Sequence, residues 1–205
     1  MAAINTKKHR QAYGIKLLLS NHPAVRKLKY QFRPSNHGHK VWTSSWLLVD
    51  YLKKSKAVWG KRVLDLACGW GTVGIYCAKK QNAVVTGADM DGDVYPFLKL
   101  MAETNKVTID FRELDFDHVR RDLLKHIDVI IASDICFCDT LIDPLRRLIQ
   151  RAKAASVEQV IIADPGRWPF DDLCEHLIGK RGAKLLEWES TKPHNAAGRI
   201  LHLEL

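Results

Sequence analysis

The segment Val63–Lys80, VLDLACGWGTVGIYCAKK, restricts the fold of this chain more than any other stretch. It predicts a buried strand, a glycine-rich turn and a helix, in that order. Gly69, Gly71 and Gly74 form the pattern G-x-G-x-x-G. Because glycine has no Cβ, backbone N–H groups in such a turn can approach a ligand closely. The segment therefore predicts a nucleotide-like ligand at the carboxyl end of a strand.

Asp65, four residues ahead of the first glycine, helps to decide between two classes of ligand. If the turn held the pyrophosphate of a dinucleotide, this carboxylate would repel it. A ligand with a positive group is a better match, and S-adenosylmethionine has an α-ammonium and a sulfonium in place of phosphates. Asp89, at the end of the next predicted strand, can bind ribose hydroxyls in either class and does not discriminate. We therefore predict S-adenosylmethionine as the cofactor.

Asp115 and Phe116 follow a third predicted strand, where the adenine of such a cofactor would lie. Acids at strand ends can also be ordinary helix caps. Three of them at successive strand ends, together with the glycine turn, favour a ligand site over a set of caps.

Strand-like and helical stretches alternate from Lys61 onward, which predicts a parallel sheet covered on both faces. Two further strands at the C-terminus have no helix between them and predict an antiparallel hairpin. The predicted fold is therefore α/β, a Rossmann-like doubly wound sheet of seven strands with a C-terminal antiparallel hairpin. The expected strands are Arg62–Leu66, Ala83–Ala88, Thr108–Glu113, Ile127–Ser133, Val157–Ala163, Ala183–Ser190 and Arg199–Leu205, and the expected helices are Trp46–Lys54, Thr72–Lys80, Asp93–Asn105, His118–Lys125 and Leu141–Ala154.

The composition, with 46% hydrophobic residues in 205, suits one globular domain with a sizeable core. No stretch is apolar enough to span a membrane, and no signal-peptide pattern opens the chain. The five cysteines are odd in number and indicate reduced thiols in a cytoplasmic protein. Cys136 and Cys138 lack a second pair, so no metal site is expected.

The basic residues are unevenly distributed along the chain. Residues 1–49 contain nine Lys and Arg and no acid, whereas the remaining residues contain 23 basic and 23 acidic side chains. The first quarter therefore favours an acidic partner, such as a protein surface, nucleic acid or anionic lipid, or else it is a solvated arm. We expect a basic N-terminal arm with helices over residues 1–40 and the ligand-binding domain over residues 41–205.

The motif VLDLACGWGTVGIYCA resembles the first motif of class I, seven-stranded methyltransferases, whose sheet ends in such a hairpin. The segments KVWTSSWLLVDYL, ASDICF and IADPGR are similar to those of the family with an Asp-x-x-Tyr motif. Many of its members methylate lysine in proteins, including the electron-transfer flavoprotein β-subunit lysine methyltransferases. The resemblance implies that Trp42 lies close to the cofactor and that Asp134 is the aspartate of the motif. Phe137 stands where the family has tyrosine.

The expected catalytic residues are Asp134, which would orient an acceptor amine, and Phe137, which would line the acceptor channel. Asp134 can also be a helix cap or turn residue. Trp70 either covers the methionine part of the cofactor or packs on a neighbouring helix, and the His37-x-His39 pair is interpreted as surface histidine in a loop. The predicted cofactor contacts are Trp42, Asp65, Ala67, Cys68, Gly69, Trp70, Gly71, Asp89, Met90, Asp115, Phe116 and Ser133.

Three functions follow from these patterns. The leading one is methylation of a protein side chain, with lysine as the acceptor. The second is a small-molecule or nucleic-acid methyltransferase; the basic first quarter fits nucleic acid, but no Asn-Pro-Pro-Tyr-type motif follows the fourth strand. The third is a binding protein that keeps the cofactor fold without catalysis, which Phe137 favours and the strand-end acids oppose.

Overall fold

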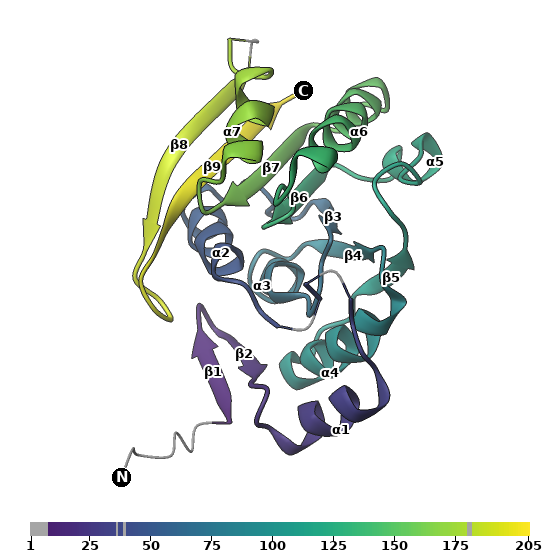
Figure 1. Ribbon diagram of the computed structural model, residues 1–205, viewed down its shortest axis with the longest axis vertical. Helices are drawn as coiled ribbons and strands as arrows, with labels where there is room; N and C mark the ends of the chain where they lie inside the picture. The colour runs from purple at the N-terminus through teal and green to yellow at the C-terminus, as the bar shows by residue number, and fades with distance from the viewer. Residues whose placement is uncertain (1–7, 36, 39, 180–181) are drawn as a thin grey trace.

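The central feature is a seven-stranded sheet with strand order β5-β4-β3-β6-β7-β9-β8 (Figure 1). The computed structural model describes residues 8–35, 37–38, 40–179 and 182–205. Strands β3 to β7 pair in parallel, and β9 runs antiparallel to β7 and β8. The predicted doubly wound fold with a C-terminal hairpin is thereby confirmed. The strands are β3 (Arg62–Leu66), β4 (Val84–Asp89), β5 (Asp110–Glu113), β6 (Val129–Ser133), β7 (Gln159–Asp164), β8 (Ala183–Ser190) and β9 (Ala196–Glu204).

Two hydrophobic clusters pack on opposite faces of this sheet. Successive side chains of a strand point to opposite faces, and along β6 Ile130 and Ile131 accordingly join different clusters. One cluster contains α2 (Thr43–Ser55), α3 (Thr72–Lys80) and α4 (Tyr95–Asn105), and the other contains α5 (Arg121–Leu124), α6 (Ile142–Ala154) and α7 (Trp168–Glu175). Because both faces are covered, residues Val129 to Ala132 of β6 form a continuous apolar run.

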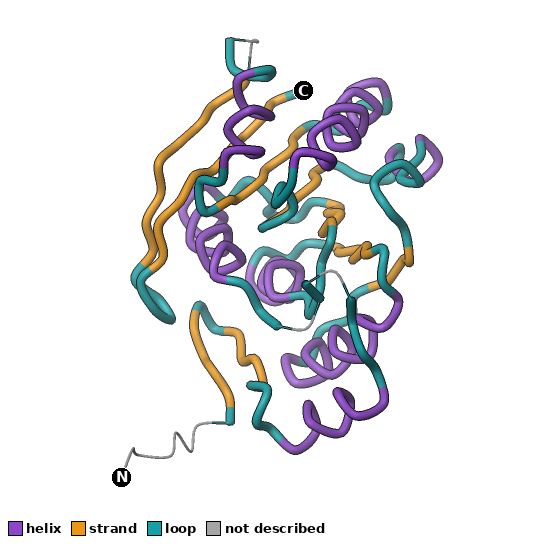
Figure 2. Tube along the Cα trace, viewed as in Figure 1, coloured by secondary structure: helices purple, strands orange, loops and turns teal. Residues whose placement is uncertain are grey.

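The described part of the basic first quarter is folded against α2, α3 and α4 (Figure 2). It forms a hairpin of β1 (His9–Ala12) and β2 (Ile15–Leu18), followed by α1 (Pro23–Gln31). Ile15 and Val25 are fully buried in the same cluster as the α2–α4 side of the core. The hairpin is therefore no solvated arm. The domain boundary expected between residues 40 and 41 remains a prediction, and residues 1–7 lie outside the described part.

The helices differ from expectation mainly at their starts. A short 3-10 turn, Gly92–Val94, precedes α4, and a second 3-10 turn, Asp139–Leu141, precedes α6. Helix α2 begins at Thr43, with Trp42 as its N-cap, whereas the expected helix began at Trp46. Helix α7 was not predicted, because the Asp-Pro-Gly-Arg sequence ahead of it has the composition of a turn. No helix in the described ranges is long and apolar enough to cross a membrane.

Candidate cofactor and acceptor site

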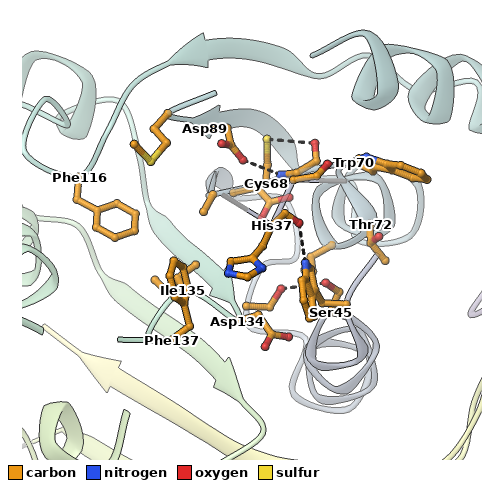
Figure 3. A pocket seen from close by; sticks show the side chains of 18 of the residues that line it. His37, Ser45, Cys68, Trp70, Thr72, Asp89, Phe116, Asp134, Ile135 and Phe137 are labelled. Carbon is orange, nitrogen blue, oxygen red and sulfur yellow. Dashed lines mark hydrogen bonds between the residues drawn. The ribbon is translucent and has the colours of Figure 1, made fainter. Parts of the chain in front are cut away.

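A cavity of about 420 Å³ lies at the carboxyl ends of the parallel strands, within the size range of ligand pockets (Figure 3). Every predicted cofactor contact except Gly71 lines this cavity, and so do Asp134 and Phe137. In an open parallel sheet this edge is where ligands bind, because the loops that follow the strands converge there. The structure thus brings residues from five separate segments of the chain into one site.

The three glycines of the turn have three different roles. A Cβ on Gly69, whose φ is 51°, would meet nothing within 4 Å, so this backbone is open to the cavity. Gly71 is the N-cap of α3 with φ 76°, and a Cβ there would collide with Leu98 of α4. Gly74 lies against the carboxylate of Asp65, where a Cβ would come within 2.8 Å of Oδ2. Gly71 therefore shapes the turn from behind the cavity rather than lining it.

Asp65 is a buried carboxylate in the wall of the cavity, with 4% of its surface exposed. Its Oδ2 accepts a hydrogen bond of 2.8 Å from the backbone N–H of Gly74. Burial raises the pKa of Asp65 to about 7; the Gly74 hydrogen bond opposes this increase, and the nearby charge of Asp89 adds to it. No ion pair of the described residues includes Asp65, so a cationic group placed in the cavity would supply the missing opposite charge.

Asp89, at the end of β4, is held by backbone donors on both oxygens. Gly69 donates its N–H to Oδ2 at 3.0 Å, and Asp91 donates its N–H to Oδ1 at 3.2 Å. Burial raises the pKa of Asp89, and the Gly69 hydrogen bond opposes this shift. The glycine turn is thereby tied to the end of β4, and the carboxylate has a fixed orientation at the cavity.

Asp115 combines the two roles that the sequence left open. Its Oδ1 accepts backbone hydrogen bonds of 2.9 Å from both Asp117 and His118, as a turn cap does. The same oxygen pairs with the His118 ring nitrogen at 2.7 Å. Asp115 nevertheless lines the cavity together with Phe116.

Two tryptophans hold residues 37 and 38 across the cavity. Trp42 donates its indole N–H to the carbonyl of His37, and Trp70 donates its own to the carbonyl of Gly38, each at 2.9 Å. The Trp70 ring is buried and stacks on Phe97 of α4, with ring centres 5.0 Å apart and planes 7° from parallel. The ring of Trp70 therefore packs on the neighbouring helix, although the residue also lines the cavity.

His37 lines the cavity, whereas its local sequence predicts a surface histidine in a loop. Its ring makes edge contacts with Trp42 at 5.4 Å and with Phe137 at 4.9 Å between centres. In Figure 3 it lies between Asp89 and Asp134. No local pattern marks it, because its neighbours in the site come from elsewhere in the chain. His39 lies outside the described residues.

Asp134 follows β6 with a left-handed φ of 61°, an uncommon conformation for a residue other than glycine. Its N–H donates to the carbonyl of Ala163 at 3.0 Å, which fixes it beside the end of β7. Its carboxylate forms an ion pair with Arg167, and the N-cap of the next 3-10 turn is a different residue, Cys138. Asp134 is thus a paired carboxylate at the cavity; its partner Arg167 belongs to the IADPGR segment, and the sequence did not predict the pairing.

The described residues contain no cluster of three side chains that could hold a metal ion. The five cysteines are free thiols, and burial raises the pKa of Cys68 and Cys77 well above the ordinary value. The sulfur of Cys68 lies against Gly87 of β4, where the space is limited.

Comparison with known proteins places this site in a family. The sequence profile of the family described as lysine methyltransferase matches residues 27–168. The electron transfer flavoprotein beta subunit lysine methyltransferase of Danio rerio is 28% identical over 132 residues, covering 64% of this chain and 50% of that protein. The ubiquinone biosynthesis O-methyltransferase of Actinobacillus pleuropneumoniae serotype 5b is 34% identical over 113 residues, covering 53% of this chain and 47% of that protein. The chain spans about half the length of these relatives.

Solved structures share the fold at low identity. Magnesium protoporphyrin IX methyltransferase of Synechocystis, with bound S-adenosylmethionine, superimposes with a TM-score of 0.55 at 16% identity, over 88% of this chain and 89% of that one. The Pyrococcus abyssi tRNA (uracil-54, C5)-methyltransferase, in complex with S-adenosyl-L-homocysteine, superimposes with a TM-score of 0.61 at 19% identity. The match covers 97% of this chain and 44% of that one. The fold and the predicted cofactor agree with these neighbours, and the profile match shows that the chain belongs to the lysine methyltransferase family.

Proposed function

We propose that this chain is an S-adenosylmethionine-dependent methyltransferase that methylates a lysine side chain of a protein. The observation that carries the proposal is a single cavity lined by Asp65 and Asp89 on one part of its wall and by Asp134 on another. The first two suit the cofactor and the third suits a cationic acceptor.

The residues of the cavity fit the cofactor on three counts. Asp65 offers an unpaired buried carboxylate for the α-ammonium, and Asp89 offers fixed carboxylate oxygens for ribose hydroxyls. The open backbone at Gly69 leaves room for close approach. When bound, the cofactor supplies a methyl group on a sulfonium, which is reactive without help from the protein. The chain contributes alignment and the exclusion of water.

Asp134 and Phe137 support an amine as the acceptor. A carboxylate at the cavity attracts an ammonium group and can orient the amine after its proton is lost. Phe137, 40% exposed at the same cavity, offers an aromatic face along which a cationic side chain can pass. The Danio rerio relative carries lysine methyltransferase in its name, whereas the Actinobacillus relative is an O-methyltransferase, so an oxygen acceptor is the competing assignment.

Transfer of tritiated methyl groups from S-adenosylmethionine into fractionated cell extract tests the function. We expect label that protease removes and nuclease does not, on lysine after hydrolysis. Label that nuclease removes would identify nucleic acid as the partner of the basic first quarter, and label in a small organic molecule would favour an oxygen acceptor. The absence of transfer to any fraction would support a non-catalytic binding protein.

Asp134→Asn keeps the shape of the side chain and removes its charge. We expect turnover to fall about a hundredfold or more, as for typical proton-handling groups, with unchanged affinity for S-adenosylmethionine by calorimetry. Asp143→Asn is the matched control, because its side chain is 75% exposed on α6. If Asp134→Asn turns over at the parent rate, the acceptor site is assigned wrongly.

A cytoplasmic location is part of the same proposal. It is supported by the five free thiols, three of them buried and none paired in a disulfide.

A further inference from the structure

Arg167 lies between two carboxylates at the ends of neighbouring strands. One is Asp134 after β6, and the other is Asp164, the last residue of β7. The two strands are in register, with Ser133 opposite Ala163. The Arg167 Nη2 atom forms an ion pair with Asp134 and lies 3.2 Å from Oδ2 of Asp164. One guanidinium nitrogen is therefore shared between two negative groups.

Asp164 is the more deeply placed of the two carboxylates. Its side chain is fully buried, whereas the side chain of Asp134 is 12% exposed and lines the cavity. Oδ1 of Asp164 accepts the backbone N–H groups of Gly166 at 2.9 Å and Arg167 at 2.8 Å. These bonds fix Asp164 at the start of α7, so it cannot follow a ligand into the cavity.

Two buried polar atoms of this cluster have no hydrogen-bond partner: Oδ2 of Asp164 and Nε of Arg167. Buried unpaired polar atoms are uncommon in folded proteins. Here an unpaired donor and an unpaired acceptor belong to the two partners of one ion pair. If the guanidinium turned onto Asp164, Nε and Nη2 would both face its carboxylate in a two-point pair, which is the stronger arrangement for arginine.

That second arrangement would release Asp134. We propose that Arg167 is an exchangeable counter-ion, which pairs with Asp134 in the absence of acceptor and moves fully onto Asp164 when a cationic acceptor reaches Asp134. The inference rests on the proposed function for the role of Asp134. Two carboxylates and one guanidinium carry a net charge of −1, which one ammonium group balances. Arg167 and Asp164 do not line the cavity, so they act as positioning residues.

The exchange can be tested without knowing the natural acceptor. The probe is n-butylammonium chloride, a mimic of the lysine side chain, added to the full chain loaded with S-adenosylhomocysteine, and n-butanol is the neutral control. NMR reports both the affinity for the probe and the Nε–H signal of Arg167, which Arg167→Lys identifies by removing it. We expect n-butylammonium, and not n-butanol, to shift this signal to that of a hydrogen-bonded group.

Asp164→Asn removes the alternative partner and keeps the Oδ1 acceptor for the backbone of α7. We expect it to weaken n-butylammonium binding by about tenfold or more and to leave the Nε–H signal unmoved, because the lost contact is a charge-assisted pair. Affinity for S-adenosylhomocysteine should stay at the parent value. Asp171→Asn is the matched control on α7, where Asp171 pairs with Arg199 instead, and it should behave as the parent.

Several results would overturn the exchange. They are an unmoved Nε–H signal in the parent protein, parent affinity for n-butylammonium in Asp164→Asn, or an equal loss of S-adenosylhomocysteine affinity, which would show a purely structural role for Asp164. The proposed function fails separately: if Asp134→Asn binds n-butylammonium as the parent does, the acceptor site itself is wrong. If Asp134→Asn binds n-butylammonium more weakly than the parent, but n-butylammonium leaves the Nε–H signal of the parent protein unmoved, only the exchange is refuted.

Discussion

Replacing Asp65 with Asn should stabilise the ligand-free protein while it weakens cofactor binding. The asparagine keeps an oxygen to accept the N–H of Gly74, which lies 2.8 Å from the present carboxylate. It removes a negative charge that is buried without an opposite charge among the described residues. A binding site that holds an unpaired charge in readiness for a ligand is expected to trade stability for affinity.

The size of the effect follows from the pKa of Asp65, which burial raises from 3.8 to about 7. The native state holds this proton more tightly than the unfolded state, so ionisation of Asp65 costs stability as the pH rises. The gap corresponds to roughly 4 kcal/mol of unfolding free energy. The cost is absent below about pH 4, grows by about 1.4 kcal/mol per pH unit up to about pH 7, and is constant above that.

Urea unfolding of the ligand-free protein at several pH values measures this difference. We expect Asp65→Asn to exceed the parent by as much as about 4 kcal/mol at pH 8 and to match it near pH 4. Calorimetry should show S-adenosylhomocysteine bound about tenfold or more weakly, because a charge-assisted contact is lost. Asp122→Asn, with a side chain 96% exposed, is the control for the substitution itself. A variant less stable than the parent at pH 8, or one with parent affinity, would refute the reasoning.

Two further substitutions test the cofactor wall and the N-terminal hairpin. Asp89→Ala should weaken S-adenosylmethionine binding about tenfold or more by calorimetry, because it removes the predicted ribose contact and the Gly69 hydrogen bond; parent affinity would contradict the ribose role. Ile15→Ala should cost about 2–5 kcal/mol of unfolding free energy in urea, because Ile15 is fully buried in the core. Tyr30→Ala, 88% exposed on α1, should stay within about 0.5 kcal/mol of the parent. If Ile15→Ala lowered the unfolding free energy no more than Tyr30→Ala does, the hairpin would not be part of the hydrophobic core.

The parallel strands and the glycine turn could be predicted because their signals are local. Strand β3 was predicted with its observed bounds, since a mostly apolar run followed by glycines leaves few alternatives. Met90 and Ser133 were expected at the cavity for the same reason: they lie at the carboxyl ends of such strands.

The parts that the sequence did not reveal depend on partners far along the chain. The β1–β2 hairpin has strands of four residues each, too short for a clear periodic pattern. Arg167 meets Asp134 across 33 positions, and His37 meets Phe137 only after the sheet has brought their loops together. Such pairings follow from strand order and register, which no local pattern encodes.

The way the hairpin is secured affects the order in which the chain can assemble. The backbone N–H and carbonyl of Lys16 both bond to the side chain of Asn105, 89 residues further along. Contacts of such long sequence separation form slowly, because a large loop must close first. During synthesis the hairpin emerges before α4 and must wait until α4 has been made. Until then this basic segment, including the apolar side chain of Ile15, lacks its partner, and a chaperone or an unintended acidic partner has access to it.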